Sequence, residues 1–301
     1  MSAISADMNR PGAPDLCVAQ AIASAVATGL DRLDAQLLLL HVLGKPAHDR
    51  AWLLAHDTDA LSPAQRATFD TCVQRRIAGE PLAYITGHKE FYGLDLRVDA
   101  RVLVPRPDTE TLVDWALEVL APATAQLTLA CITDPRQSTV LDLGTGSGAI
   151  ALALKATRPD LTVRAIDYSD DALAVARANA QHLQLDVQFQ QGSWLAGVAG
   201  KYHAIVSNPP YIAAQDEHLS ALTHEPLQAL ASGDDGLDDL RCIITQAPAC
   251  LLAGGWLLLE HGYDQAAAVR DLLRAAGFRH VQSRQDLSGI ERCSGGQRPQ
   301  A

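Results

Sequence analysis

The amino-acid sequence predicts an α/β fold, in which a parallel sheet with crossover helices follows a small helical bundle. Three observations carry this prediction. The chain has 301 residues, more than the roughly 100–200 residues of a usual single domain. Its first third shows helical periodicity with recognisable start and stop signals. After Pro105, short apolar runs alternate with helical stretches, which is typical of strands and crossover helices.

Two segments of the first third are predicted to be helices. An amphipathic segment opens at Asp31 and stops at Gly44. A second helix has Ser62 as its N-cap and Pro63 at the first helical position, and it runs to a stop at Gly79. Together these segments indicate a small helical bundle.

A β-hairpin is expected between the two main parts of the chain. The alternating runs His88–Tyr92 and Leu94–Val98 flank Gly93. We therefore place the domain boundary there. The predicted domains are a disordered leader (residues 1–14), a helical domain (15–86), a β-hairpin linker (87–104) and a catalytic domain (105–301).

The last part of the chain is expected to form the parallel sheet. Its apolar runs are short and nearly continuous, as in strands buried on both faces. Predicted strands cover residues 139–143, 162–167, 187–189, 203–207 and 255–260, and predicted helices cover residues 149–157 and 170–183.

Composition and charge narrow the classes of function. The formal net charge is −11, and the chain from Val104 onward has 14 Lys and Arg against 23 Asp and Glu, a balance of −9. Nucleic acid binding normally needs a basic face, so direct nucleic acid binding is not expected. No apolar run reaches the roughly 20 residues that a membrane helix needs, so we expect no membrane partner and a cytoplasmic location. The scattered Cys and His residues lack metal-ligand spacing, so no metal site is expected.

A glycine-rich turn is the first candidate binding site. The run Gly144-Thr145-Gly146-Ser147-Gly148 lies between the predicted strand 139–143 and the predicted helix 149–157. Glycines let the backbone pass close to a ligand because no Cβ stands in the way. A cofactor can lie on such a loop, although glycine turns also serve plain connections and dinucleotide sites.

Two further residues fit a cofactor that contains adenosine. Asp167 ends the next predicted strand, 19 residues after Gly148, where a carboxylate can accept hydrogen bonds from both ribose hydroxyls. The alternative for Asp167 is a helix N-cap, but Asp170 is better placed for that role. Trp194 follows the predicted strand 187–189 and either borders the adenine or is a partly buried core residue.

The tetrapeptide Asn208-Pro209-Pro210-Tyr211 favours a methyltransferase over a nucleotide redox enzyme. Its two prolines cannot continue the strand ladder and hold the backbone in a rigid, extended course. A planar NH₂ group can donate one hydrogen to the Asn208 side-chain oxygen and the other to a main-chain carbonyl, expected to be that of Pro209. Tyr211 would stack on the flat substrate group. These contacts aim the nitrogen lone pair at a methyl group, so the sequence predicts N-methyl transfer from S-adenosyl-L-methionine.

A general base is not needed by this arrangement. Glu260 and His261 end the last predicted strand and could suggest one. Polar groups at strand ends commonly satisfy nearby loops instead, and we interpret both residues in that way.

Longer motifs carry a resemblance to a known family. They are the segments Arg76–Gly87 (RIAGEPLAYITG), Val104–Glu110 (VPRPDTE), the glycine loop, Ser207–Ile212 (SNPPYI) and Glu225–Leu230 (EPLQAL). Together they resemble the release factor glutamine methyltransferase family, known as PrmC or HemK, over about residues 30–292. The tetrapeptide alone is shared with adenine-N6 DNA methyltransferases and guanine-N2 RNA methyltransferases, so the resemblance rests on the combination.

The resemblance implies a fold, an activity and a partner. The fold is a Rossmann-like S-adenosylmethionine-dependent methyltransferase domain with a small N-terminal helical bundle that helps to grip the substrate. The reaction transfers a methyl group from S-adenosyl-L-methionine to the side-chain amide nitrogen (N5) of the glutamine in the GGQ motif. The implied partners are class-1 peptide chain release factors, which carry that motif.

The resemblance also implies site residues. Cofactor contacts fall on Gly144–Gly148, Asp167, Trp194 and Asn208, and substrate contacts fall on Asn208, Pro209, Pro210 and Tyr211. Arg106 lies beside the expected site and is given a positioning role.

Two segments depart from the family pattern. Leu222-Thr223-His224 stands where the family has a basic-aromatic stretch, which affects the expected substrate contacts of that loop. Ser294-Gly295-Gly296-Gln297 spells the target tripeptide. We interpret this match as a coincidence in a flexible tail rather than as self-methylation.

Two other functions stay open at the level of sequence. An N-methyltransferase acting on an exocyclic base amine of DNA or RNA is compatible with the tetrapeptide, but the −9 balance disfavours it. A non-catalytic cofactor-binding scaffold is disfavoured by the intact Asn208, because a degenerate member would be expected to lose this acceptor first.

Overall fold

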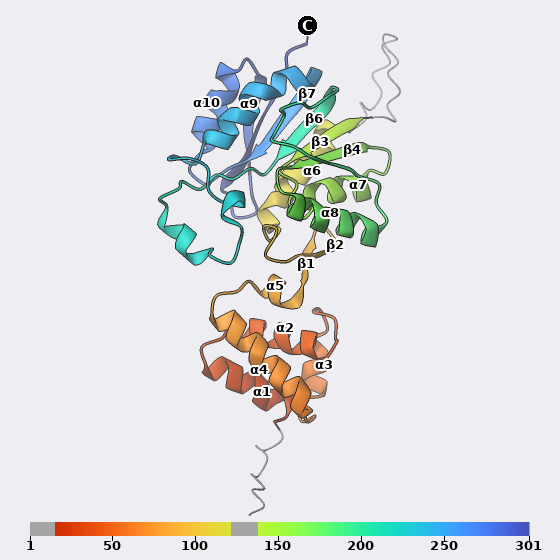
Figure 1. The fold of residues 1–301 in the computed structure, drawn as a ribbon, viewed down its shortest axis with the longest axis vertical. Helices are drawn as coiled ribbons and strands as arrows, with labels where there is room; N and C mark the ends of the chain where they lie inside the picture. Colours follow the sequence, from red (N-terminus) through yellow and green to blue (C-terminus); the bar gives the residue numbers. More distant parts are fainter. Residues whose placement is uncertain (1–15, 122–137, 301) are drawn as a thin grey trace, which may run out of the picture. The chain divides into compact units, whose positions relative to one another are not determined.

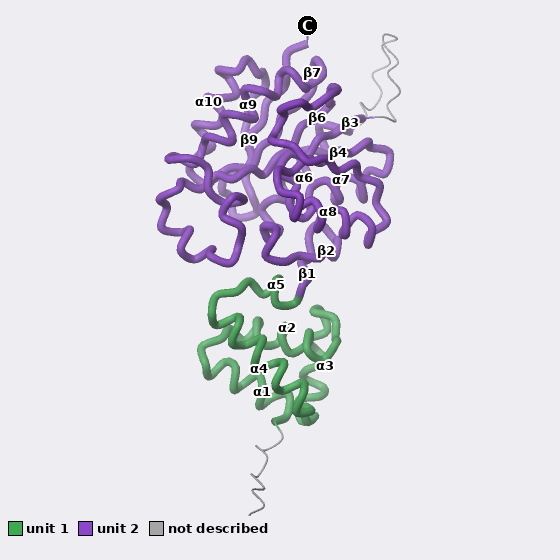
Figure 2. Tube along the Cα trace, viewed as in Figure 1, with its two compact units in different colours: residues 1–86 green, residues 87–301 purple. Residues whose placement is uncertain are grey.

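The computed structural model describes residues 16–121 and 138–300, so the leader predicted over residues 1–14 lies outside the described residues. The chain divides into two compact units, residues 1–86 and 87–301 (Figure 2). Each unit has a hydrophobic core of its own.

The described part of the first unit is helical, as the sequence predicts. The helix α2 starts after Asp31, whose side chain accepts a hydrogen bond from the Leu33 N–H. At the start of α4, Ser62 and Gln65 form a reciprocal capping box and Pro63 is the first helical residue, which confirms the predicted start. The helices are α1 (Val18–Ala27), α2 (Arg32–Val42), α3 (Arg50–Ala55), α4 (Pro63–Ile77) and α5 (Leu82–Thr86).

The predicted hairpin forms and is part of the second unit. Strands β1 (His88–Phe91) and β2 (Leu94–Arg97) pair antiparallel. Phe91 and Leu96 are buried in the core of the second unit. The Asn179 side chain accepts a hydrogen bond from the Arg97 N–H at 2.8 Å and donates one to the Arg97 carbonyl at 3.0 Å. These contacts hold the hairpin against the helix that carries Asn179.

The described residues of the second unit form a seven-stranded sheet in the order β5-β4-β3-β6-β7-β9-β8 (Figure 1). Strands β3 to β7 run parallel, and β9 is antiparallel to both of its neighbours. The strands are β3 (Thr139–Leu143), β4 (Thr162–Asp167), β5 (Gln188–Gln191), β6 (Tyr202–Ser207), β7 (Leu251–Glu260), β8 (Arg279–Gln285) and β9 (Glu291–Gln297). The five predicted strands therefore match the parallel part of the sheet, with ends that differ by a few residues.

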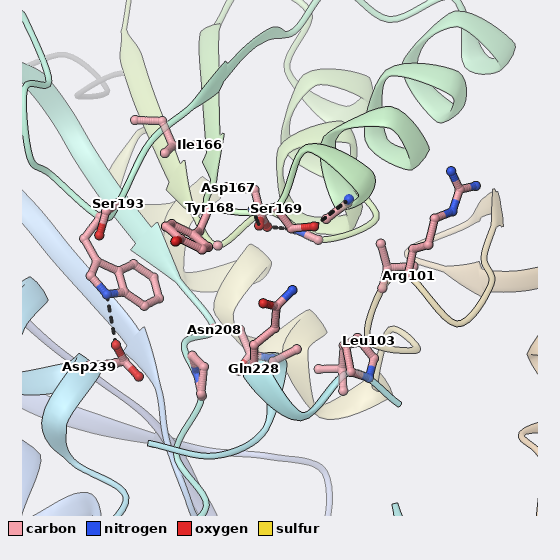
Figure 3. A pocket seen from close by; sticks show the side chains of 18 of the residues that line it. Arg101, Leu103, Ile166, Asp167, Tyr168, Ser169, Ser193, Asn208, Gln228 and Asp239 are labelled. Atoms are coloured by element: carbon pink, nitrogen blue, oxygen red, sulfur yellow. Dashed lines mark hydrogen bonds between the residues drawn. The ribbon is translucent and has the colours of Figure 1, made fainter. Parts of the chain in front are cut away.

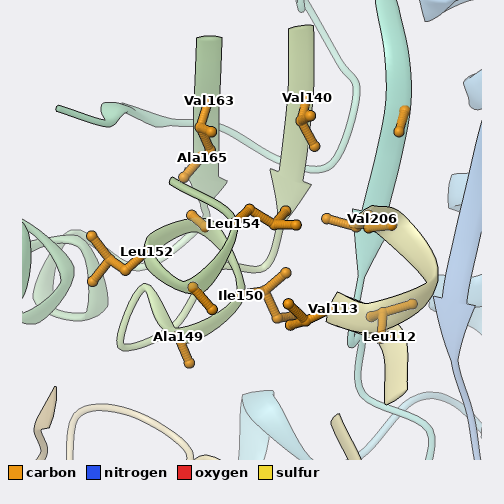
Figure 4. Packing of buried hydrophobic residues seen from close by; sticks show 14 of the residues in the cluster. Leu112, Val113, Val140, Ala149, Ile150, Leu152, Leu154, Val163, Ala165 and Val206 are labelled. Carbon is orange, nitrogen blue, oxygen red and sulfur yellow. The ribbon is translucent and has the colours of Figure 1, made fainter. Parts of the chain in front are cut away.

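Helices cover both faces of this sheet. Alternate residues of a strand point to opposite faces, so Val140 packs in one core cluster and Leu141 in the other. One face is covered by α6, α7 and α8, and the other by α9 and α10 (Figures 1 and 4). These helices are α6 (Glu110–Val119), α7 (Ala149–Thr157), α8 (Asp170–Leu183), α9 (Asp238–Cys250) and α10 (Ala266–Ala275). The second unit thus has the three-layer α/β architecture that the sequence predicts.

The GGQ sequence near the end of the chain is not in a flexible tail, which corrects our interpretation. It belongs to β9, and Ser294 is fully buried. A Cβ on Gly295 would lie 2.6 Å from Leu258 Cδ2 and 2.8 Å from the Leu257 oxygen, so only glycine fits between the strands. The Gln297 amide donates a hydrogen bond to the Gly254 carbonyl at 2.8 Å. The tripeptide is therefore a structural part of the sheet, and the folded chain holds this glutamine in place.

Candidate active site

A cavity of about 320 Å³ lies at the carboxyl ends of the parallel strands in the second unit. Its volume is within the range of roughly 300–1,000 Å³ that small-molecule sites occupy. It is lined by the loops after β3, β4, β5 and β6, by residues 101–103 and by Pro226, Gln228 and Ala229. In Figure 3, Asp167 and Tyr168 lie on one side of the cavity and Asn208 and Gln228 on the facing side. This is the usual place for a ligand in an open α/β sheet.

The glycine loop brings its backbone to this cavity. Gly144 and Gly146 line the wall, with φ angles of 68° and 54° that favour glycine. A Cβ on Gly144 would lie 3.3 Å from the Trp194 ring. A Cβ on Gly148 would lie 3.0 Å from Leu152 Cδ1, so this third glycine serves the packing of α7 and α8 instead. The loop therefore combines ligand access with helix packing.

The side chains of the two polar loop residues do not line the cavity. The Thr145 hydroxyl donates to Asp142 Oδ2 at 2.6 Å. Ser147 is buried, and its carbonyl accepts a hydrogen bond from Asn179 Nδ2 at 2.9 Å. Thr145 and Ser147 thus hold the loop in shape.

Asp142 is a buried carboxyl group with an unused acceptor. Its side chain is fully buried, and burial raises the pKa to about 7. Its Oδ2 atom accepts hydrogen bonds from Thr145 and from the Ala151 N–H, but no described residue donates to Oδ1. A buried acceptor without a partner is costly, so a donor on a ligand would be stabilised there. Asp142 lies in the predicted strand 139–143, two residues before the glycine run, and reasoning from sequence assigned it no role.

Asp167 lies in the cavity wall at the end of β4. Its Oδ2 atom accepts from the Gly146 N–H at 2.8 Å and its Oδ1 atom from the Ser169 N–H at 2.9 Å. Burial raises its pKa, and the backbone hydrogen bonds oppose that rise. The following helix α8 is capped by Ser169, which accepts from the Ala172 N–H, rather than by Asp170 as predicted. Each Asp167 oxygen keeps a second lone pair that a ligand hydroxyl can use.

Trp194 lies between the cavity and the core, and its contact with the adenine stays a prediction. It lines the cavity and also packs against the core cluster on the α9 face of the sheet. Its φ angle of 49° is unusual for a residue with a side chain. The ring nitrogen donates to Asp239 Oδ1 at 2.9 Å, which fixes the ring against the Gly144 backbone. Asp239 has no motif around it, and only the fold reveals it as part of the site.

The Asn-Pro-Pro-Tyr segment begins where β6 ends. The Ser207 hydroxyl donates to the Leu143 carbonyl at 2.7 Å and ties this end to β3. Asn208 and Pro210 line the cavity, whereas Pro209 and Tyr211 do not. The Tyr211 hydroxyl points to Glu260 Oε1 at 3.5 Å, and burial raises the pKa of this phenol. Stacking of Tyr211 on the substrate therefore stays a prediction.

Arg106 lies behind the cavity wall and not in it. Its guanidinium pairs with Glu225, whose other oxygen accepts from the Val104 N–H at 3.0 Å. Glu225 therefore links residues 101–106 to residues 226–229, and of these two segments reasoning from sequence placed only Arg106 beside the site. The first segment overlaps the motif Val104–Glu110 and the second lies within the motif Glu225–Leu230, so these motifs were the available signal.

The segment Leu222-Thr223-His224 precedes this link. It follows the 3₁₀ turn η2 (Glu217–Ala221) and contributes no side chain to the cavity. The effect of its departure from the family pattern on substrate contacts stays a prediction.

Two sequence models match the two units separately. Residues 19–87 match the PrmC N-terminal domain, and residues 119–261 match the methyltransferase small domain. The release factor glutamine methyltransferase of Coxiella burnetii is 48% identical over 263 residues, which cover 87% of this chain and 90% of that protein. The protein of the same name from Bordetella pertussis is 50% identical over 272 residues, covering 89% and 95%. This chain belongs to the release factor glutamine methyltransferase family.

A solved structure supports the methyltransferase fold of this chain. A methyltransferase from Pyrococcus furiosus superposes with a TM-score of 0.51 at 17% identity, covering 79% of this chain and all of that one. In the ranges that the structure describes, no helix is long and apolar enough to cross a membrane. Within the same ranges, no group of three His, Cys, Asp or Glu side chains could hold a metal ion.

The cofactor of these methyltransferases is S-adenosylmethionine, and the cavity residues fit it. Gly144 and Gly146 bring their backbone to the cavity wall, and Asp167 offers acceptors there for ligand hydroxyls. The Trp194 ring offers a flat apolar surface for a base. Gly144, Gly146, Asp167 and Trp194 would hold the adenosine part, with Asn208 close to the remainder.

Proposed function

We propose that this chain transfers a methyl group from S-adenosyl-L-methionine to the side-chain N5 of the glutamine in the GGQ motif of class-1 peptide chain release factors. Translation takes place in the cytoplasm, and we propose that the enzyme acts there. One observation carries the proposal: Asn208 and Pro210 line the same cavity as the glycine loop and Asp167. The family relationship to release factor glutamine methyltransferases supports the choice of substrate.

An amide nitrogen is a poor nucleophile because its lone pair is shared with the carbonyl group. The cofactor supplies an activated methyl group when bound. What remains for the protein is to hold the nitrogen in line and to stabilise the charge that develops on it. Asn208 can do both, since its side-chain oxygen can accept one hydrogen of the substrate NH₂ group while a carbonyl of the proline pair accepts the other.

The acidic character of the catalytic unit supports a protein substrate. The chain from Val104 onward has a balance of −9, and Asp167 and Asp239 stand in the cavity wall. A polynucleotide would bring further negative charge to this surface, which opposes binding.

Labelled-methyl transfer tests the proposal. Purified chain is incubated with radiolabelled S-adenosylmethionine and, in parallel, with an intact release factor, a factor with its GGQ glutamine changed to alanine, duplex DNA and RNA. We expect label only in the factor that keeps the glutamine. Label in both factors would place the modification elsewhere, and label in DNA or RNA would favour a base-amine methyltransferase.

We further propose that the helical unit docks the release factor. The catalytic site touches only a small part of a folded substrate, so binding energy from a distant surface is needed to hold the glutamine in place. A shortened chain that starts at Gly87 should bind cofactor normally but methylate intact factor far more slowly. Circular dichroism would check its folding. Equal rates for the shortened and full chains would contradict docking by the helical unit.

A further inference from the structure

The two ends of the Asn208 side-chain amide face different surroundings. Its Nδ2 atom donates to the Thr109 hydroxyl at 3.2 Å. Thr109 is buried and belongs to the 3₁₀ turn η1 (Pro107–Thr109), which leads into α6. The two residues are 99 positions apart in sequence, so the contact depends on the tertiary fold. The Thr109 hydroxyl can either donate a hydrogen bond to the Asn208 side chain or accept one from it. This choice decides which end of the Asn208 amide faces the substrate.

The buried carboxyl group of Glu260 decides whether the Thr109 hydroxyl donates to Asn208 or accepts from it. Glu260, at the end of β7, is 1% exposed; burial raises its pKa to about 7, and a hydrogen bond from the Thr109 side chain opposes that rise. In its ionised form, which dominates above about pH 7, Glu260 only accepts hydrogen bonds, and a threonine hydroxyl has a single hydrogen. With that hydrogen given to Glu260, Thr109 can only accept from Asn208. The Asn208 amide must then present its NH₂ group to Thr109, which leaves its oxygen for the cavity.

We propose that Thr109 and Glu260 are positioning residues that hold the Asn208 side chain with its oxygen directed at the substrate NH₂ group. This inference rests on the proposed function, because it matters only for a substrate that donates hydrogens. A reversed amide would set one NH₂ group against another and remove the acceptor from the site. Glu260 also lies 3.5 Å from the Tyr211 hydroxyl, so the same carboxylate restrains both ends of the tetrapeptide.

The arrangement accounts for a polar cluster that the reaction does not otherwise need. Burying a carboxyl group is costly unless it is hydrogen-bonded, and Glu260 Oε2 has no partner among the described residues. Glu260 is nevertheless placed directly behind Thr109 and Tyr211.

Substitutions at Thr109 test the proposal in the full-length chain. Thr109→Val keeps the side-chain shape and removes the hydroxyl, whereas Thr109→Ser keeps the hydroxyl. We expect Thr109→Val to lower kcat for intact release factor about 10- to 100-fold, the scale for a misoriented group at a reacting centre. Cofactor Kd should stay within about 2-fold, and Thr109→Ser should restore most of kcat. Thr157→Val, at an exposed threonine of α7, is the matched control.

A second measurement does not depend on activity. In chain labelled with ¹⁵N-asparagine, the Asn208 side-chain NH₂ signal is assigned by its loss in Asn208→Asp. We expect this signal to shift in Thr109→Val and to stay near its original position in Thr109→Ser and Thr157→Val. Glu260→Gln provides a second perturbation if Thr109→Val fails to fold, and it should shift the same signal and lower kcat.

The outcomes separate this inference from the proposed function. If the parent chain labels no release factor, the proposed function is wrong, and an unchanged Asn208 signal in Thr109→Val would overturn the inference as well. If the parent labels the factor and Thr109→Val is equally fast, only the inference is overturned. Equal losses of kcat in Thr109→Val and Thr109→Ser would also overturn it, because the hydroxyl would then not be the feature that matters.

Discussion

Replacement of Glu225 by alanine should loosen the cavity, because this carboxylate joins two of its walls. The Glu225 side chain is only 3% exposed. It accepts hydrogen bonds from the buried Val104 N–H at 3.0 Å and from the Arg106 guanidinium. The cavity is lined by residues 101–103, which precede Val104 in the chain, and by Pro226, Gln228 and Ala229, which follow Glu225.

The cost of Glu225→Ala can be estimated from its two contacts. A buried N–H left without an acceptor costs roughly 1–3 kcal/mol, which applies to Val104. The side chain of Arg106 is 39% exposed, so after discounting for solvent screening its ion pair contributes at most about 1 kcal/mol. We expect a total loss of about 1–4 kcal/mol. For a domain of this size, about 2–4 °C per kcal/mol gives a fall in Tm of about 2–16 °C.

Glu225→Gln provides a graded comparison. Glutamine keeps an acceptor for the Val104 N–H and loses only the charge that faces Arg106, so the expected loss is about 1 kcal/mol or less. Glu217→Ala, at an exposed glutamate of the same loop, is the matched control. Scanning calorimetry would measure Tm. Titration calorimetry would measure the cofactor Kd, which should rise in Glu225→Ala because the cavity is loosened. If Glu225→Ala melts with the parent, or if the alanine and glutamine variants lose equal stability, the bond to Val104 does not hold the walls together.

Three further perturbations address single residues of the site. Asn208→Ala should lower methyl transfer by at least ~10²-fold and leave cofactor binding largely intact; single-turnover rates equal to those of the parent would refute its role as acceptor. Asp167→Ala should weaken cofactor binding by roughly 1–3 kcal/mol, or about 5- to 150-fold in Kd, and an unchanged Kd by calorimetry would exclude the ribose contact. The pKa of Asp142 is raised by burial from 3.8 to about 7 in the folded chain, so the folded state binds more protons than the unfolded state between these values. Its stabilising contribution is complete below about pH 4 and is lost as the pH rises through about 7. Stability of the cofactor-free Asp142→Asn variant should therefore fall less over this interval, and parallel denaturation curves for the parent and the variant would contradict the raised pKa.

The sequence alone determined the local elements of the catalytic unit. Predicted strands 139–143 and 162–167 coincide with β3 and β4, and predicted helices 149–157 and 170–183 coincide with α7 and α8. These elements depend on short-range features, namely apolar runs, glycine turns and helix caps, which can be recognised in a few neighbouring residues. The Asn-Pro-Pro-Tyr segment was recognisable for the same reason, since its rigidity is a property of the two prolines themselves.

Only the tertiary structure decided which side chains meet. Ser294 to Gln297 look like a polar tail in sequence, because glycines and a glutamine lack strand propensity. The sheet nevertheless recruits them into β9, where the close approach of Leu257 and Leu258 leaves room only for glycine. The links from Asn208 to Thr109 and from Glu225 to Val104 likewise join residues 99 and 121 positions apart. Local preferences select each element, but contacts over such separations depend on how the packed elements are arranged, which no short stretch of sequence encodes.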